Sequence, residues 1–214
     1  MRMGRPRRRM GFRCARRLVP LPCGSGAGRL RHRIRDPNGF SRRPDDSFVV
    51  AGLNDGHKYQ IATDGRARTP LESIDGVPLG SVNYACAAGP GRICSSVMTR
   101  HLPWVAALRS STPDDYVVHL DTVEARAQIA ADRLDFTNEI KVSPEDRYRH
   151  AAETLDCRIV GFPVRPEGPL GANDCADPRS LGWGSLPDGI IFDAVGNVWV
   201  AITRQNPLSS SGWG

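Results

Sequence analysis

The sequence has no long hydrophobic run, few aromatic residues and almost no lysine. None of its apolar stretches approaches the roughly 20 residues that a membrane-spanning helix needs, so we do not expect an integral membrane protein. Aromatic residues make up 7% of the 214 residues, whereas there are 22 glycines and 17 prolines. This balance argues against a helical bundle and favours many short strands joined by turns.

Charge is distributed unevenly along the chain. Lysine occurs twice, against 27 arginines. Residues 1–43 hold 14 arginines and one acidic residue, a local net charge of +13, while the remaining 171 residues carry −7. Such a tail can bind nucleic acid or an acidic surface, but its Pro- and Gly-punctuated pattern fits an irregular extension better. We therefore predict a disordered Arg-rich segment at residues 1–47 and no nucleic-acid partner.

The cysteine pattern gives no sign of a disulfide framework or a zinc site. The six cysteines form no C-x-x-C pair, and no histidine stands at a zinc-like spacing from them. Cys86 and Cys94 fall in apolar segments, where buried thiols are common. Charged residues interrupt the apolar core that a secretory leader would need after Arg7, so we expect a cytoplasmic protein.

From Ser47 onward, short apolar runs alternate with turn signals. The run Phe48–Leu53, for example, is followed by Asn-Asp-Gly, and several further runs of similar length follow at similar spacing. This alternation of short apolar runs and turn residues predicts an all-β sandwich, barrel or propeller over residues 48–214. The segment Thr122–Leu134 lacks an apolar stripe, so we interpret it as a turn and a strand and not as a helix.

Three segments of the chain repeat one pattern, and each opens with an oxygen-bearing side chain. The openings are Asn83, Asn138 and Asp188, which are 55 and 50 residues apart. A turn residue follows eight positions later in each segment, at Gly91, Asp146 and Gly196. This spacing is close to that of four-stranded propeller blades, whose innermost strands surround one axis. We expect the three openings to converge at one mouth of a channel; the alternative is that each is a local turn residue.

These segments resemble the SMP-30/gluconolactonase/LRE-like family of six-bladed propellers, which includes lactonases. Residues 186–201, LPDGIIFDAVGNVWVA, are similar to the family's PDG…D…G…WVA blade, and residues 135–154 and 80–99 are similar to the two blades before it. The resemblance covers roughly residues 48–206. It implies a partial β-propeller of about three to four four-stranded blades.

The resemblance also implies a site. In this family a divalent cation at the channel mouth is held by one Glu, two Asn and one Asp. Asn83, Asn138 and Asp188 match three of these ligands, and Asp188 would act as general base. Ca²⁺ is the expected cation, with Mg²⁺, Mn²⁺ and Zn²⁺ as alternatives. His101 lies in a loop that would touch a lactone or sugar-acid substrate; the competing interpretation is a surface loop anchored by Trp104.

The sequence departs from the family at several points. No counterpart of the Glu ligand occurs in residues 1–60, and Glu139 should face away from Asn138 because side chains alternate along a strand. Six blades need about 270–300 residues, more than residues 48–214 supply. Trp199 is expected in the core. The function predicted is a metal-dependent lactonase impaired by a missing ligand and missing blades; the alternative is a non-catalytic binding protein or an inactive gene fragment.

Overall fold

The computed structural model describes residues 9–13, 17–21, 34, 36–109, 113–164, 179–203 and 208–211. Within these ranges the chain forms β-strands and one short 3₁₀ helix, η1 (Trp104–Arg109). No helix in the described ranges is long and apolar enough to cross a membrane. The prediction of an all-β fold is confirmed.

Four sheets follow one another along the chain, and in each the strands pair with their neighbours in chain order, antiparallel. The first contains β3 (Pro37–Arg42), β4 (Phe48–Gly52), β5 (Lys58–Ile61) and β6 (Ala67–Leu71). The second contains β9 (Ser81–Ala87), β10 (Arg92–Thr99), β11 (Asp115–Asp121) and β12 (Arg126–Leu134). The third contains β13 (Thr137–Val142), β14 (Tyr148–Glu153), β15 (Arg158–Pro163) and β16 (Arg179–Ser180). The fourth contains β17 (Pro187–Phe192), β18 (Val198–Ile202) and β19 (Leu208–Ser211).

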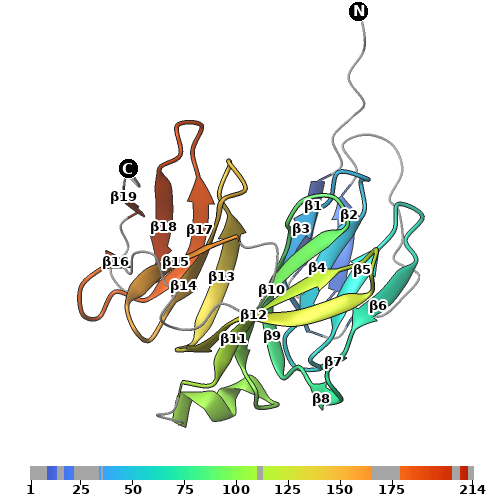
Figure 1. Cartoon of the computed structure of the whole chain (residues 1–214), viewed down its shortest axis with the longest axis horizontal. Helices are drawn as coiled ribbons and strands as arrows, with labels where there is room; N and C mark the ends of the chain where they lie inside the picture. The colour runs from blue at the N-terminus through green and yellow to red at the C-terminus, as the bar shows by residue number, and fades with distance from the viewer. Residues whose placement is uncertain are drawn as a thin grey trace, which may run out of the picture.

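The four sheets are arranged along an arc, as in an incomplete propeller (Figure 1). The first strands of successive sheets contact one another: β3 contacts β9, β9 contacts β13, and β13 contacts β17. We call these four the inner strands. Two small hairpins complete the described chain, β1 (Arg9–Arg13) with β2 (Arg17–Leu21) and β7 (Ser73–Ile74) with β8 (Val77–Pro78). The predicted count of three to four blades is confirmed.

Apolar side chains fill the space between neighbouring sheets. Val49 of β4 belongs to a buried cluster with Val97 of β10, which joins the first sheet to the second. Equivalent clusters join the second sheet to the third and the third to the fourth. A strand that is covered on both faces can be apolar without alternation. β4 of the first sheet, with the sequence FVVAG, is buried throughout, because Val49 packs against the second sheet while Phe48 and Val50 pack in a separate cluster that includes Ile34.

Within the described ranges, the fourth sheet is covered on one face only. Val198 and Val200 of β18 are buried against the third sheet, whereas Trp199 between them is 37% exposed and Ile191 of β17 is 64% exposed. The prediction of Trp199 as a core residue was therefore wrong. Trp199 lies on the opposite face of β18 from Val198 and Val200, and no described sheet lies beyond β17–β19 to cover that face.

The first sheet begins earlier in the chain than the sequence predicted. β3 lies at residues 37–42, within the segment 1–47 that we assigned to the irregular basic region, and it pairs with β4. Its sequence, PNGFSR, has one large apolar residue, so no strand pattern marks it. Elsewhere the division at residue 48 stays a prediction, because much of residues 1–35 lies outside the described residues.

Several smaller predictions can be compared with the structure. Residues 122–125 form a turn before β12, as predicted. Cys86, Cys94 and Cys157 are buried free thiols, and burial raises the pKa of Cys86 and Cys94 above that of an ordinary thiol. The other three cysteines lie outside the described residues.

Two histidines of the middle sheets are held neutral by their surroundings. His150 of β14 is 3% exposed and packs edge-on against Phe192, with 5.1 Å between ring centres. His119 of β11 accepts a hydrogen bond at Nδ1 from Arg149 Nη2 at 2.7 Å. Burial, as the largest cause, lowers the pKa of each histidine to about 4; the positive charge of Arg149 adds to this at His119.

Stability should therefore fall in mild acid. Between pH 6.5 and about 4 the unfolded chain takes up protons at these histidines while the folded chain does not, so protonation favours unfolding. Each pKa unit corresponds to about 1.4 kcal/mol, which gives His150 an upper bound of about 3 kcal/mol. Urea unfolding should give a lower unfolding free energy at pH 4.5 than at pH 7, and His150→Leu should reduce this difference. An unchanged pH dependence in His150→Leu would contradict this assignment.

Candidate functional site

Each inner strand has one bulged residue that the strand beside it lacks, at the same position in every sheet; beside β9, a second shift between Val97 and Thr99 of β10 restores the register. The pairing register shifts by one between Pro37 and Phe40 in β3, around Asn83 in β9, between Thr137 and Ile140 in β13, and between Pro187 and Ile190 in β17. These are β-bulges, which turn side chains out of the regular alternation and often lie next to functional sites.

A cavity of about 210 Å³ is lined by the residues of these bulges and their neighbours. The lining residues are Asn38, Gly39, Asn83, Tyr84, Asn138, Glu139, Asp188 and Gly189. The three residues that the repeats singled out, Asn83, Asn138 and Asp188, therefore lie around one cavity. Asn83 is buried, Asn138 is half-buried, and Asp188 is the most exposed of the three. The sequence analysis missed Asn38, although it occupies the same position in the first sheet.

Asn38 and Asn83 are joined through their side chains. Asn38 Nδ2 donates hydrogen bonds to Asn83 Oδ1 at 2.7 Å and to the Asn83 carbonyl oxygen at 3.1 Å. On its other side, Asn83 Nδ2 donates to the sulfur of Met98 at 3.5 Å. The carboxamide of Asn83 is thus held from both ends.

Asn138 and Asp188 form the second pair. Partial burial, followed by the negative charge of Glu139, raises the pKa of Asp188 above that of an ordinary aspartate, and a hydrogen bond with the Asn138 side chain opposes this rise. Asn138 Nδ2 also donates to Thr154 Oγ1 at 3.4 Å, and Thr154 Oγ1 donates to the Pro187 carbonyl at 2.7 Å. The third and fourth sheets are therefore hydrogen-bonded directly beside the two site residues.

The structure corrects the expected orientation of Glu139. Strict alternation predicted that Glu139 would face away from Asn138, but both residues line the cavity because the bulge in β13 interrupts the alternation. The carboxylate of Glu139 is well paired. Its Oε2 accepts a hydrogen bond from the Ile190 backbone N–H at 2.7 Å, and its Oε1 lies 2.6 Å from Lys141 Nζ.

Lys141 connects Glu139 to the first two sheets. Its Nζ donates a hydrogen bond to Tyr84 Oη and lies 4.4 Å from the centre of the Tyr84 ring. Tyr84 Oη in turn donates to the Phe40 carbonyl at 3.2 Å. We call the chain Phe40–Tyr84–Lys141–Glu139–Ile190 the inner relay; it links all four inner strands beside the cavity.

Two glycines make room for the relay. A Cβ on Gly39 would lie 2.0 Å from Tyr84 Cδ2 and 2.8 Å from Tyr84 Cα, and a Cβ on Gly189 would lie 2.9 Å from Glu139 Oε2. The Asp-Gly pair of β17 therefore has a physical explanation. Asp188 faces the cavity, and the absence of a side chain at Gly189 lets Glu139 reach the backbone of β17.

His101, which the sequence analysis placed against substrate, is not among the residues that line the cavity. It lies in the loop after β10, where its side chain is exposed and its Nε2 is 3.8 Å from Asp114 Oδ2. Its carbonyl accepts a hydrogen bond from Ser81 Oγ at 2.8 Å. Trp104, the first residue of η1, packs against Phe136 with 6.2 Å between ring centres. A role of His101 in substrate contact stays a prediction.

The donor set of the cavity suits a hard cation. No group of three or more His, Cys, Asp or Glu in the described part of the chain could hold a metal ion. The cavity instead offers carboxamide oxygens and the carboxylate of Asp188. Ca²⁺ and Mg²⁺ prefer such oxygen ligands, whereas structural Zn²⁺ sites rely on nitrogen and sulfur. The residues present therefore fit Ca²⁺ or Mg²⁺ better than Zn²⁺.

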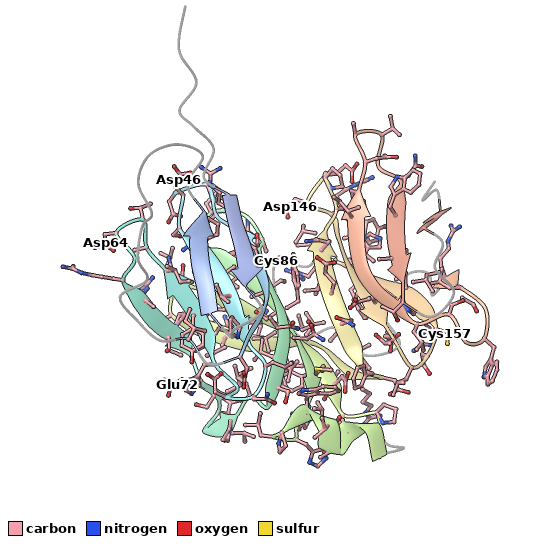
Figure 2. The ribbon with its side chains drawn as sticks, turned by 180° about the vertical axis from the view of Figure 1, so that it is seen from behind. Asp46, Asp64, Glu72, Cys86, Asp146 and Cys157 are labelled. Atoms are coloured by element: carbon pink, nitrogen blue, oxygen red, sulfur yellow. The ribbon has the colours of Figure 1, made fainter. Side chains whose placement is uncertain are left out.

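A sequence signal for Asn38 exists in retrospect. Asn38 precedes Asn83 by 45 residues, and Asp46 follows it by eight, the interval seen in the other three segments. The four residues at this interval all have left-handed backbone: Asp46 (φ 65°), Gly91 (φ 69°), Asp146 (φ 56°) and Gly196 (φ 89°). Asp46 and Asp146 lie at the same end of their sheets in Figure 2. The scarcity of apolar residues around Asn38 concealed the repeat.

The contacts of the two glycines generate a prediction about stability. Gly189→Ala should cost about 1–3 kcal/mol of unfolding free energy, because the carboxylate of Glu139 must move. Gly39→Ala should cost more, because the backbone of Tyr84 is also in the way. Urea unfolding measures both. In a Glu139→Ala background the cost of Gly189→Ala should shrink; an undiminished cost would refute the contact as its cause.

Comparison with known proteins supports the fold. The described chain superposes on a gluconolactonase from Xanthomonas campestris with a TM-score of 0.69 and 21% identity, covering 91% of this chain and 68% of that one. It superposes on regucalcin, a calcium-binding protein from Agrobacterium tumefaciens, with a TM-score of 0.64 and 17% identity, covering 91% and 63%. At these identities the likeness shows a shared fold.

The sequence comparisons extend over most of the chain. The adipocyte plasma membrane-associated protein of Mus musculus is 25% identical over an alignment of 181 residues that covers 80% of this chain and 42% of that protein. The chain thus spans less than half the length of this curated relative. A family model described as the SMP-30/Gluconolactonase/LRE-like region matches residues 24–210. The match includes all four inner strands, β3 among them, and the chain belongs to the SMP-30/gluconolactonase/LRE-like family.

Proposed function

We propose that this protein is a lactonase that hydrolyses a small lactone, such as a sugar lactone, with the help of a divalent cation. The observation that carries the proposal is the cavity itself, where four bulges bring three carboxamides and the carboxylate of Asp188 together. Family membership and the fold shared with a gluconolactonase support the same reaction class. Ca²⁺ is the cation that we propose first, followed by Mg²⁺ and Mn²⁺.

Asn83, Asn138 and Asp188 would hold the cation. When bound, it would polarise the lactone carbonyl and stabilise negative charge on the carbonyl oxygen. The protein's own residues would do the rest. Asp188 would accept the proton of the attacking water as the general base. Asn138, hydrogen-bonded to Asp188, would keep that carboxylate in place.

Glu139 affects how tightly the site is expected to bind a cation. The family resemblance implies a Glu ligand that this sequence does not match, and Glu139 is the second carboxylate at the cavity. Its charge is already balanced by Lys141 at 2.6 Å, and its other oxygen is bonded to the Ile190 amide. Asp188 is then the one uncompensated acid among the lining residues, so we propose weak cation binding and reduced activity compared with a site of two free carboxylates.

The activity can be tested by hydrolysis of an aldonolactone with Ca²⁺ or Mn²⁺ present. Asp188→Ala should reduce turnover by about 10²–10⁴-fold, because it removes both a ligand and the general base. Asp64→Ala is the matched control, since Asp64 is exposed in a turn and caps the Arg66 amide far from the cavity. EDTA should abolish turnover in the unmodified protein.

Two results would contradict the proposal. Equal turnover by the unmodified chain and Asp188→Ala would remove Asp188 from the reaction. Absence of any cation-dependent turnover would favour the alternative function, a non-catalytic propeller-like binding protein or an inactive fragment.

A further inference from the structure

We infer that Asn38 is a positioning residue for the oxygen site, and that it acts by fixing the carbonyl group of the Asn83 side chain toward the cavity. The inference rests on the proposed cation site but assigns a residue that neither the repeats nor the family resemblance identified. Asn38 lines the cavity from the first sheet, which contributes no residue to the ligand set proposed above.

The hydrogen bonds of Asn83 show how this would work. A carboxamide can be rotated by 180° about its terminal bond, which exchanges its oxygen with its NH₂ group. In this structure Asn38 Nδ2 donates to the oxygen at 2.7 Å, and the Met98 sulfur accepts from the nitrogen at 3.5 Å. Rotation would place two NH₂ groups face to face, so the observed orientation is favoured.

The oxygen of Asn83 keeps a free lone pair in this arrangement. A carboxamide oxygen has two lone pairs, and Asn38 uses one of them. The second remains for a cation in the cavity that both residues line. Hydrogen-bonding partners of this kind orient metal ligands, and their loss typically lowers metal affinity by about 10–100-fold.

Asn38 is itself held by more than this one contact. Its Nδ2 also donates to the Asn83 backbone carbonyl at 3.1 Å. β3 is fixed against β9 by two further hydrogen bonds, from Tyr84 Oη to the Phe40 carbonyl at 3.2 Å and from the Ala87 amide to Ser41 Oγ at 3.3 Å. The first sheet therefore presents Asn38 to Asn83 from a rigid position, and removing the Asn38 carboxamide leaves the packing of the two strands in place.

The test is calorimetric titration of the full chain with CaCl₂. Asn38→Leu keeps the branched shape of the side chain without the donor, and Asn38→Ala is a second variant in case the larger leucine disturbs the fold. Both should bind Ca²⁺ about 10–100-fold more weakly than the unmodified chain. Asn54→Ala is the matched control, because Asn54 is an exposed asparagine that donates to Asp36 at 3.1 Å outside the cavity. Its Ca²⁺ affinity should be unchanged.

Two further measurements separate positioning from general damage. The urea midpoint of the cation-free Asn38 variants should stay close to that of Asn54→Ala, whereas a purely structural role would lower it. In a double-mutant cycle, Asn38→Leu should cost little additional affinity once Asn83→Ala is present, because the partner through which it acts is gone. Fully additive losses, or unchanged affinity in both Asn38 variants, would overturn the inference.

The same titration distinguishes this inference from the proposed function. If the unmodified chain binds no Ca²⁺ or Mn²⁺, the cation site and the role of Asn38 fail together. If it binds the cation and Asn83→Ala weakens binding, but the Asn38 variants do not, the proposed site stands and the inference about Asn38 alone is refuted.

Discussion

The extra residue in each inner strand is the feature on which the candidate site depends. In a regular strand, consecutive side chains point to opposite faces, so Asn138 and Glu139 could not both line one cavity. The bulge removes this restriction, and it recurs in β3, β9, β13 and β17 at the same distance from the following turn. Four small deviations from regular pairing thus convert the inner edges of the sheets into a polar cavity.

The inner relay complements the bulges. A closed propeller is held together by the continuity of its ring, but the sheets described here form an open arc (Figure 1). Here a tyrosine, a lysine and a glutamate connect the inner strands beside the cavity, and two glycines allow them to do so. The same glutamate neutralises the lysine and adds to the rise that partial burial causes in the pKa of Asp188, so the relay affects the site electrostatically as well as structurally.

The sequence predicted much of this fold, for identifiable reasons. The strands after Ser47 are short apolar runs between turn residues, and the eight-residue interval located Asn83, Asn138 and Asp188. The features that the sequence did not predict depend on local backbone geometry or on which sheets lie next to one another. Asn38 lies in a strand with almost no apolar pattern. The orientation of Glu139 follows from a β-bulge, and no residue type in the sequence predicts that bulge. The exposure of Trp199 depends on what lies beyond the fourth sheet, which periodicity along β18 cannot reveal.

The one-sided burial of the fourth sheet has a consequence for the lifetime of the assembled site. A unit that buries apolar surface on one face opens more readily than units covered on both, so β17 and β18 are expected to separate before the middle sheets do. Asp188 and the amide of Ile190 would leave with them, while Asn38, Asn83 and Asn138 would stay in place. The fraction of molecules in which all four side chains surround the cavity is then set by how often the fourth sheet separates from the third. A ligand that bridges Asp188 to the three asparagines would hold the fourth sheet in place.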